Sequence, residues 1–215
     1  MHVTCIAFFL YIPWEMKDSM IDGTRLILAS SSPRRAALLR QLRLEFEIIP
    51  SSVDENVNGY KSPIRLVTSI AREKANEVAA RVSEGTIVAA DTVVVLDGRQ
   101  LGKPRDAAEA REMLCLLSGK EHCVYTGFAL LHMPSRESMS DYEVTRVKFR
   151  DLSAEEIDSY VKSGTCFDKA GAYGIQDDFG AVFVERIDGC YYNVVGFPLT
   201  KFYLAWQEFQ KRING

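Results

Sequence analysis

The sequence lacks the features that define several large classes of protein. It has no excess of one charge, because 26 basic and 29 acidic residues give a net charge of -3. A chain without an excess of positive charge is a poor partner for duplex nucleic acid. It has only three histidines, and its five cysteines are scattered and never spaced as Cys-x-x-Cys. This pattern favours unpaired thiols in a reducing compartment over a disulfide framework or a zinc site, so we expect a cytoplasmic protein.

The chain begins with an apolar stretch that is too short for a transmembrane helix. Residues 3–14 are mostly apolar, but Pro13 interrupts them and no lysine or arginine precedes them. The stretch therefore lacks both the length to span a bilayer and the basic flank of a secretory signal. We expect residues 1–24 to form an N-terminal extension packed on the body or at a subunit contact, with a weak targeting role as the alternative.

The remaining residues carry a mixed pattern of strands and helices. With 215 residues, 47% of them hydrophobic, the chain can bury a core in one domain or in two small lobes. The pattern predicts an α/β domain over residues 25–215, with a mixed twisted sheet, flanking helices and two lobes around a central cleft. Strands are expected at 26–29, 44–50, 86–96, 121–133, 138–149, 182–187 and 190–195, and helices at 33–42, 63–82, 107–117, 154–163 and from 198 onward.

The stretch from Leu26 to Leu42 turns from a buried strand directly into a helix. Ser32 is a good N-cap, and Pro33 fits the first helical position. Arg34 and Arg35 then occupy the first turn, where partial positive charge on unpaired N–H groups makes each cation cost about 0.3–1 kcal/mol. A phosphate held by N–H groups, serine hydroxyls and two guanidinium groups would remove this conflict. The alternative is two solvated arginines.

Two further charged residues stand where charge is costly. Lys74 lies on the apolar stripe of the helix expected at 63–82, so its amine either reaches out to solvent or points into a cleft. Asp91 interrupts an apolar strand, where a carboxylate needs a cation, hydrogen bonds or a metal.

A hairpin signal brings a second cation to Asp91. Asp97-Gly98 is typical of a two-residue turn, and counting outward from it sets Thr92 opposite Lys103. Asp91, Thr92 and Lys103 are therefore expected to be neighbours. The alternative is a structural Asp–Lys pair on an edge hairpin.

Six short segments, taken in order, carry a resemblance to known proteins. They are Ala-Ser-Ser-Ser-Pro-Arg-Arg at 29–35, Ala-Arg-Glu-Lys-Ala at 71–75, Ala-Asp-Thr-Val-Val at 90–94, Gly-Lys-Pro-Arg-Asp at 102–106, Asp-Lys-Ala-Gly-Ala-Tyr-Gly-Ile-Gln at 168–176 and Tyr-Asn-Val-Val-Gly-Phe-Pro-Leu at 192–199.

These segments resemble the Maf family of nucleotide pyrophosphatases, and only residues 1–24 lie outside the resemblance. The resemblance implies an inosine-triphosphatase-like fold, a homodimer, and hydrolysis of nucleoside triphosphates to the monophosphate and pyrophosphate with a divalent metal, Mg²⁺ or Mn²⁺. Segment 168–176 is similar to that of the branch acting on dTTP and UTP. The sequence departs from the family after Gln176, where glycine is more usual.

The resemblance also implies roles for single residues. Asp91 would be the proton acceptor or a metal ligand, and Glu55 a second carboxylate beside the metal. Gln176 offers both a donor and an acceptor, which suits the O4 and N3–H edge of thymine or uracil. The implied phosphate-binding or catalytic residues are Ser30, Arg34, Arg35, Lys74 and Lys103, and the implied selectivity positions are Arg34, Thr92 and Gln176.

Two other functions stay open from the sequence. One is a nucleotide-binding regulator of cell division that uses the same pocket with little turnover. The other is a pyrophosphatase acting on 7-methyl-GTP. Nucleic acid and membrane partners are not expected.

Overall fold

The computed structural model describes residues 25–55, 62–176 and 178–215. The expected extension, residues 1–24, lies outside the described residues. The elements are β1 (Leu26–Leu28), α1 (Pro33–Gln41), β2 (Glu47–Ile48), α2 (Pro63–Ala79), β3 (Gly85–Leu96), β4 (Arg99–Leu101), α3 (Ala107–Leu117), β5 (Glu121–Met133), β6 (Ser138–Phe149), α4 (Ala154–Lys162), the 3-10 helices η1 (Ala170–Ala172) and η2 (Asp178–Phe183), β7 (Val184–Asp188), α5 (Tyr191–Val195) and α6 (Leu199–Asn214).

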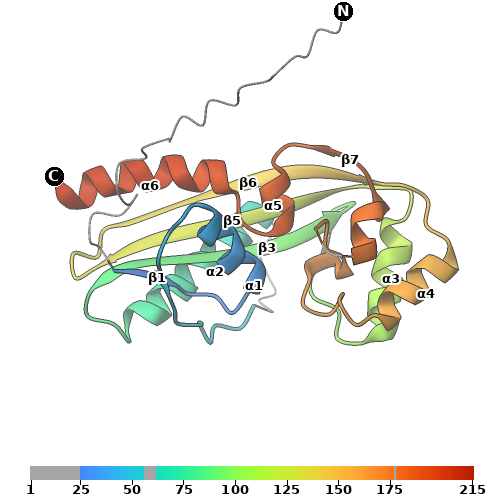
Figure 1. The fold of residues 1–215 in the computed structure, drawn as a ribbon, viewed down its shortest axis with the longest axis horizontal. Helices are drawn as coiled ribbons and strands as arrows, with labels where there is room; N and C mark the ends of the chain where they lie inside the picture. The colour runs from blue at the N-terminus through green and yellow to red at the C-terminus, as the bar shows by residue number, and fades with distance from the viewer. Residues whose placement is uncertain (1–24, 56–61, 177) are drawn as a thin grey trace, which may run out of the picture.

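A seven-stranded mixed sheet forms the centre of the molecule (Figure 1). Its order is β2-β1-β3-β5-β6-β7, with β4 also paired to β3. The first two strands run parallel to β3, whereas β4, β5, β6 and β7 pair antiparallel with their neighbours. The expected mixed α/β sheet with flanking helices is confirmed.

Strand β3 changes partner along one edge. Its start pairs with β1 as far as Val88, and its end pairs with β4 from Val94 onward. Its other edge pairs with β5 throughout residues 85–95. Among the described strands, none covers the first edge at residues 89–93, so the Lys74 side chain reaches the Ala90 carbonyl there.

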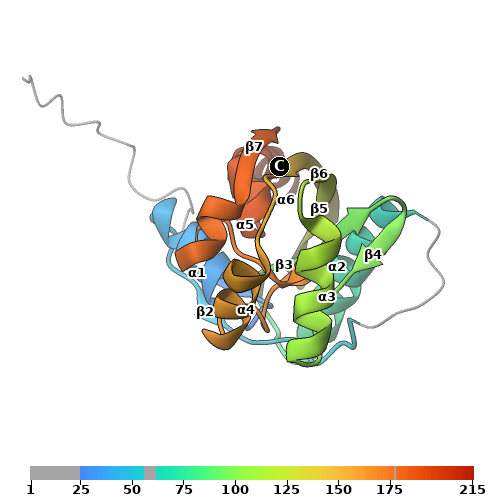
Figure 2. The same ribbon diagram turned by 90° about the vertical axis from the view of Figure 1, so that its right-hand side faces the viewer.

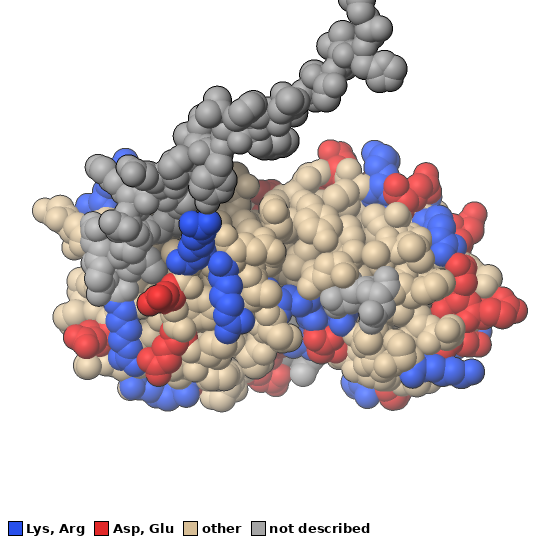
Figure 3. Space-filling view, in the orientation of Figure 1, with Lys and Arg blue, Asp and Glu red and all other residues tan. Residues whose placement is uncertain are grey.

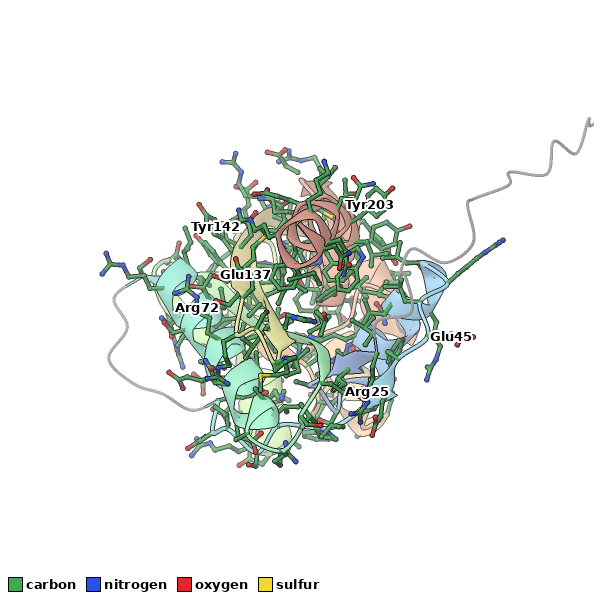
Figure 4. All side chains as sticks on the ribbon, turned by 90° about the vertical axis from the view of Figure 1, so that its left-hand side faces the viewer. Arg25, Glu45, Arg72, Glu137, Tyr142 and Tyr203 are labelled. Atoms are coloured by element: carbon green, nitrogen blue, oxygen red, sulfur yellow. The ribbon has the colours of Figure 1, made fainter. Side chains whose placement is uncertain are left out.

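The two faces of the sheet are covered differently. Because side chains alternate along a strand, Ile87 and Ala89 face α2, whereas Val88 and Ala90 face the apolar cluster of α1 and α6. Figure 4 shows this arrangement from the end, with Arg72 on α2 and Tyr203 on α6 on opposite sides of the strands.

A second cluster lies on the same face as α6 but further along β3. Val94 and Leu96 pack there with α3 and α4, at the end of the molecule that faces the viewer in Figure 2. Thr92, between Ala90 and Val94 on this face, therefore lies where the two clusters separate. These clusters are the cores of the two lobes expected from the sequence.

Local capping explains where the helices begin. Ser32 and Ser62 accept hydrogen bonds as N-caps before Pro33 and Pro63, as the sequence predicts. Ser153 forms the expected capping box before α4.

The strand expected at 190–195 is wrong, because residues Tyr191–Val195 form helix α5. The turn signal Asp188-Gly189 predicts a strand after it, but Asn193 is fully buried and its side-chain amide donates to the Val124 carbonyl and to Thr145 Oγ1, 3.0 and 2.9 Å away. These contacts stabilise a helical turn that lies across the sheet. Tertiary packing therefore overrides the local preference for a strand. The strand expected before it begins two residues late, as β7.

Gly127 sets how closely α2 approaches the sheet. It is the cross-strand partner of Asp91, and a Cβ there would lie 2.6 Å from the Val67 carbonyl carbon and 2.7 Å from the Thr68 nitrogen. No L-residue with a side chain fits without moving the helix.

We predict that Gly127→Ala lowers the free energy of unfolding by about 1–3 kcal/mol, because overpacking forces α2 away from β5. Urea denaturation followed by circular dichroism measures this change. Gly102→Ala is the matched control, since a Cβ at Gly102 meets nothing within 4 Å. Equal stability of the two variants would contradict the prediction.

Candidate active site

A cleft of about 900 Å³, part of it open to solvent, lies between the two lobes. Figure 3 shows lysine and arginine side chains in the hollow where the lobes meet. The lining comes from the α1 N-terminus, β3, the segment after β4, the loop at 168–176 and the end of α5. It includes these expected residues: Ser30, Arg34, Arg35, Glu55, Asp91, Thr92, Lys103 and Gln176.

Arg35 is buried and held by neutral oxygens. Its Nε donates to the Gly196 carbonyl, Nη1 to Ser30 Oγ and Nη2 to Thr92 Oγ1, each at 3.1 Å. Burial lowers the pKa of Arg35, and the nearby carboxylates oppose that change. The alternative of a solvated arginine is therefore wrong for this residue.

Arg34 instead crosses the cleft to the loop at 168–176. Its Nη1 lies 2.5 Å from Asp168 Oδ2, and its Nη2 donates to the Asp168 carbonyl at 3.0 Å. The two arginines of the helix start thus reach both walls of the cleft.

Lys74 does not reach out to solvent. It is 4% exposed, and its Nζ donates to Asp91 Oδ1 at 2.8 Å, to Glu55 Oε1 at 2.7 Å and to the Ala90 carbonyl at 3.3 Å. Asp91 lies on the part of β3 whose edge no described strand covers, so the amine of α2 can enter there. The apolar stripe thus carries a lysine whose ammonium is paired with carboxylates lining the cleft.

Lys103 joins the group through Glu55. Its Nζ lies 2.7 Å from Glu55 Oε2, which completes a chain of alternating charge from Asp91 through Lys74 and Glu55 to Lys103. Burial alone would raise the pKa of Glu55, but the two lysines hold it at about 2. Glu55 therefore stays ionised at neutral pH.

The expected cross-strand pairing of Thr92 with Lys103 is wrong. The register from the turn is as predicted for three pairs, but β4 ends at Leu101. The chain then leaves the sheet because the Gly102 carbonyl accepts a hydrogen bond from the backbone of the 168–176 loop, at Gly171. On its other edge, Thr92 pairs with Thr126 of β5.

Sequence reasoning gave no role to Asp168 and Lys169. Asp168 Oδ1 lies 2.9 Å from the nearly buried Lys169 Nζ, so this carboxylate contacts Lys169 as well as Arg34. Burial would raise the pKa of Asp168, but hydrogen bonds from Lys169 and Arg34 lower it. The segment Asp-Lys-Ala-Gly could have indicated this pair, because it places an acidic and a basic residue directly before a glycine turn.

A buried histidine near the cleft also has no signal in the sequence pattern. His122 Nε2 and the Tyr173 hydroxyl lie 2.8 Å apart, and burial lowers the pKa of His122 to about 4. The neutral imidazole therefore anchors Tyr173, which lines the cleft.

The acidic donors of the cleft suit a hard divalent cation. Within the described ranges, no group of three or more His, Cys, Asp or Glu side chains could hold a metal alone. Asp91 and Glu55 supply carboxylate oxygens on either side of one ammonium, and phosphate oxygens of a substrate would complete an oxygen ligand set. Such oxygen donors would suit a hard divalent cation bound together with an anionic ligand.

The fold and the cleft define a mixed α/β protein with a charged cleft between two apolar clusters. Residues 25–209 match the family model described as Maf-like protein, and the chain belongs to this family.

The match spans almost the full length of the relatives that carry curated names. The protein named dTTP/UTP pyrophosphatase from Carboxydothermus hydrogenoformans is 51% identical over 184 residues, covering 86% of this chain and 98% of that protein. The one of the same name from Bacillus cytotoxicus is 48% identical over 185 residues, covering 86% and 95%. Among solved structures, a HAM1 protein from Coxiella burnetii has a TM-score of 0.47 and 17% identity, covering 86% of this chain and 99% of that one.

We predict that the stabilisation by Glu55 depends on pH. Because the folded-state pKa of about 2 lies below the ordinary 4.5, this stabilisation is present above pH 4.5 and is lost as pH falls toward 2. The difference in unfolding free energy between the wild type and Glu55→Gln should therefore shrink from pH 6 to pH 3. Urea denaturation at both pH values measures it, and a difference independent of pH would show that the lysines do not stabilise the carboxylate.

Proposed function

We propose that this chain is a nucleoside triphosphate pyrophosphatase that converts dTTP and UTP to the monophosphate and pyrophosphate. One observation carries the proposal: the cleft joins Asp91, Lys74, Glu55 and Lys103 in a chain of alternating charge beside the arginines of the α1 N-terminus. The names of the relatives support the choice of substrate.

The cations would bind and align the phosphates. Arg34, Arg35 and the N–H groups at the start of α1 face the same cleft as Lys103, whose side chain is 54% exposed. Such groups stabilise charge that builds on the phosphoryl and leaving oxygens in the transition state. Ser30, bonded to Arg35, lies on the same wall.

Asp91 would accept the proton of the attacking water. The hydrogen bond from Lys74 to Asp91 Oδ1 fixes the orientation of this carboxylate. A role for Asp91 as a metal ligand beside Glu55 is the alternative assignment. When bound, a divalent cation polarises the phosphoryl group and acidifies a water molecule.

Thr92, Gln176 and Arg34 would select the nucleotide. All three line the cleft, and Gln176 is exposed there. Its amide supplies both a donor and an acceptor, which matches the O4 and N3–H edge of uracil and thymine.

Three expectations from the sequence stay predictions. They are the division into an extension at 1–24 and a domain at 25–215, the homodimer, and the cytoplasmic location. Of the helices in the described ranges, none has the length and apolar character needed to cross a membrane.

Asp91→Asn should lower pyrophosphate release from dTTP by at least about 100-fold, because a general base contributes about 10²–10⁴-fold. Asparagine keeps the shape and an oxygen that accepts from Lys74, whose ammonium still pairs with Glu55, and a thermal melt verifies that the variant folds. The control is Asp158→Asn on α4, whose carboxylate pairs with Arg111 away from the cleft. Turnover of Asp91→Asn within a few fold of the wild type would refute the assignment.

Initial rates across a nucleotide panel test the substrate. With Mg²⁺ or Mn²⁺ we expect pyrophosphate release from dTTP and UTP to exceed that from dCTP, dGTP and 7-methyl-GTP, and a chelator should abolish it. A preference for 7-methyl-GTP would contradict the proposed substrate. Binding without pyrophosphate release would instead support the nucleotide-binding regulator.

A further inference from the structure

Thr92, which is half-buried and lines the cleft, lies beside the buried Thr126. Thr92 of β3 and Thr126 of β5 are cross-strand partners, and their hydroxyl oxygens are 3.0 Å apart. Thr126 is fully buried, and its neighbours on the same face, Val124 and Phe128, are apolar core residues of the two lobes. Packing alone would favour valine at this position, since a buried hydroxyl costs free energy unless it is hydrogen-bonded.

The hydrogen bonds around these hydroxyls restrict where their protons can lie. Arg35 Nη2 donates to Thr92 Oγ1, so this oxygen already accepts one bond. Thr92 can donate to Thr126 Oγ1 at 3.0 Å or to the Gly196 carbonyl at 3.4 Å. Thr126 can donate to the Asn193 carbonyl at 3.3 Å or to Thr92.

Each hydroxyl has one proton, so two arrangements place a proton between the two hydroxyl oxygens, which are 3.0 Å apart. In the first, Thr92 donates to Thr126 and Thr126 donates to Asn193. In the second, Thr126 donates to Thr92 and Thr92 donates to Gly196. The Thr92 proton goes to an acceptor within the protein in both arrangements, and only the first leaves a Thr92 lone pair for a ligand.

We propose that Thr126 is a positioning residue that makes Thr92 face the cleft as a hydrogen-bond acceptor only. The cleft then favours a nucleotide that presents an N–H or O–H donor at this point and disfavours one that presents an acceptor. This inference rests on the proposed function, because it assumes a nucleotide in the cleft. The donor in dTTP is either the N3–H of the base or the sugar hydroxyl, whereas N3 of cytosine is an acceptor.

The position of α5 supports this role for Thr126. Asn193, whose carbonyl faces Thr126, is itself fixed by its side-chain bonds to Val124 and Thr145. Thr145 Oγ1 also donates to the carbonyl of Cys190, at the start of the same helix. The acceptor for Thr126 is therefore held rigidly rather than presented by a free loop.

The test compares Thr126→Val with the matched variant Thr126→Ser, which keeps the hydroxyl. We would measure kcat and KM for dTTP, dCTP, N3-methyl-dTTP and 2′,3′-dideoxy-TTP. The wild type should reject at least one analogue that lacks the donor. The preference is the ratio of kcat/KM for dTTP to kcat/KM for that analogue. In Thr126→Val this ratio should fall at least fivefold, mainly through a change in KM. In Thr126→Ser it should stay within twofold of the wild-type ratio. The N3-methyl analogue and dCTP report on the base, and the dideoxy analogue on the sugar.

A double-mutant cycle separates positioning from a general packing defect. Thr92→Val should remove the same preference, and adding Thr126→Val to it should change the preference no further. Thermal melts verify folding, and Thr126→Ala replaces Thr126→Val in every comparison if valine prevents it. Unchanged preferences in folded Thr126→Val or Thr126→Ala would overturn the inference. Absence of dTTP turnover in the wild type would instead refute the proposed function.

Discussion

The buried pair of Lys74 and Asp91 constrains the rest of the molecule. Removing one partner of such a pair leaves an uncompensated charge and typically costs about 3–5 kcal/mol. The pair forms only if α2 packs directly on β3 and β5, which requires the missing side chain at Gly127. It also requires an uncovered edge of β3 at Asp91, which the change of partner from β1 to β4 provides. The ion pair, the glycine and the strand order thus depend on one another.

The same change of partner produces the cleft. Two apolar clusters pack on one face of β3, before and after Thr92, and neither α6 nor α3 covers the strand between them. Asp91 points to the α2 side of the sheet and Thr92 to the other, because neighbours on a strand face opposite ways. Because no described strand covers the edge of β3 at this point, both side chains line the cleft, and one ligand can meet both of them.

Much of this could be predicted from the sequence, because it depends on local rules. Caps fixed the start of α1, and the interrupted apolar pattern singled out Lys74 and Asp91 before any contact was known. The rest depends on contacts between distant segments. Helix α5 forms because Asn193 reaches across two strands, and Lys103 leaves the hairpin because Gly102 bonds the 168–176 loop. Neither contact has a signature in nearby residues.

The charged residues of the cleft differ in how their charges are compensated, and Arg35 in the first turn of α1 stands apart from the others. Asp168 contacts Arg34 and Lys169, and Glu55 contacts Lys74 and Lys103. In the described part of the chain, Arg35 is held by neutral oxygens and forms no ion pair. It lies beside N–H groups that carry partial positive charge, and the nearby carboxylates of Asp91 and Glu55 oppose the lowering of its pKa by burial. The proposed phosphate site therefore includes the position where the sequence alone showed an electrostatic conflict.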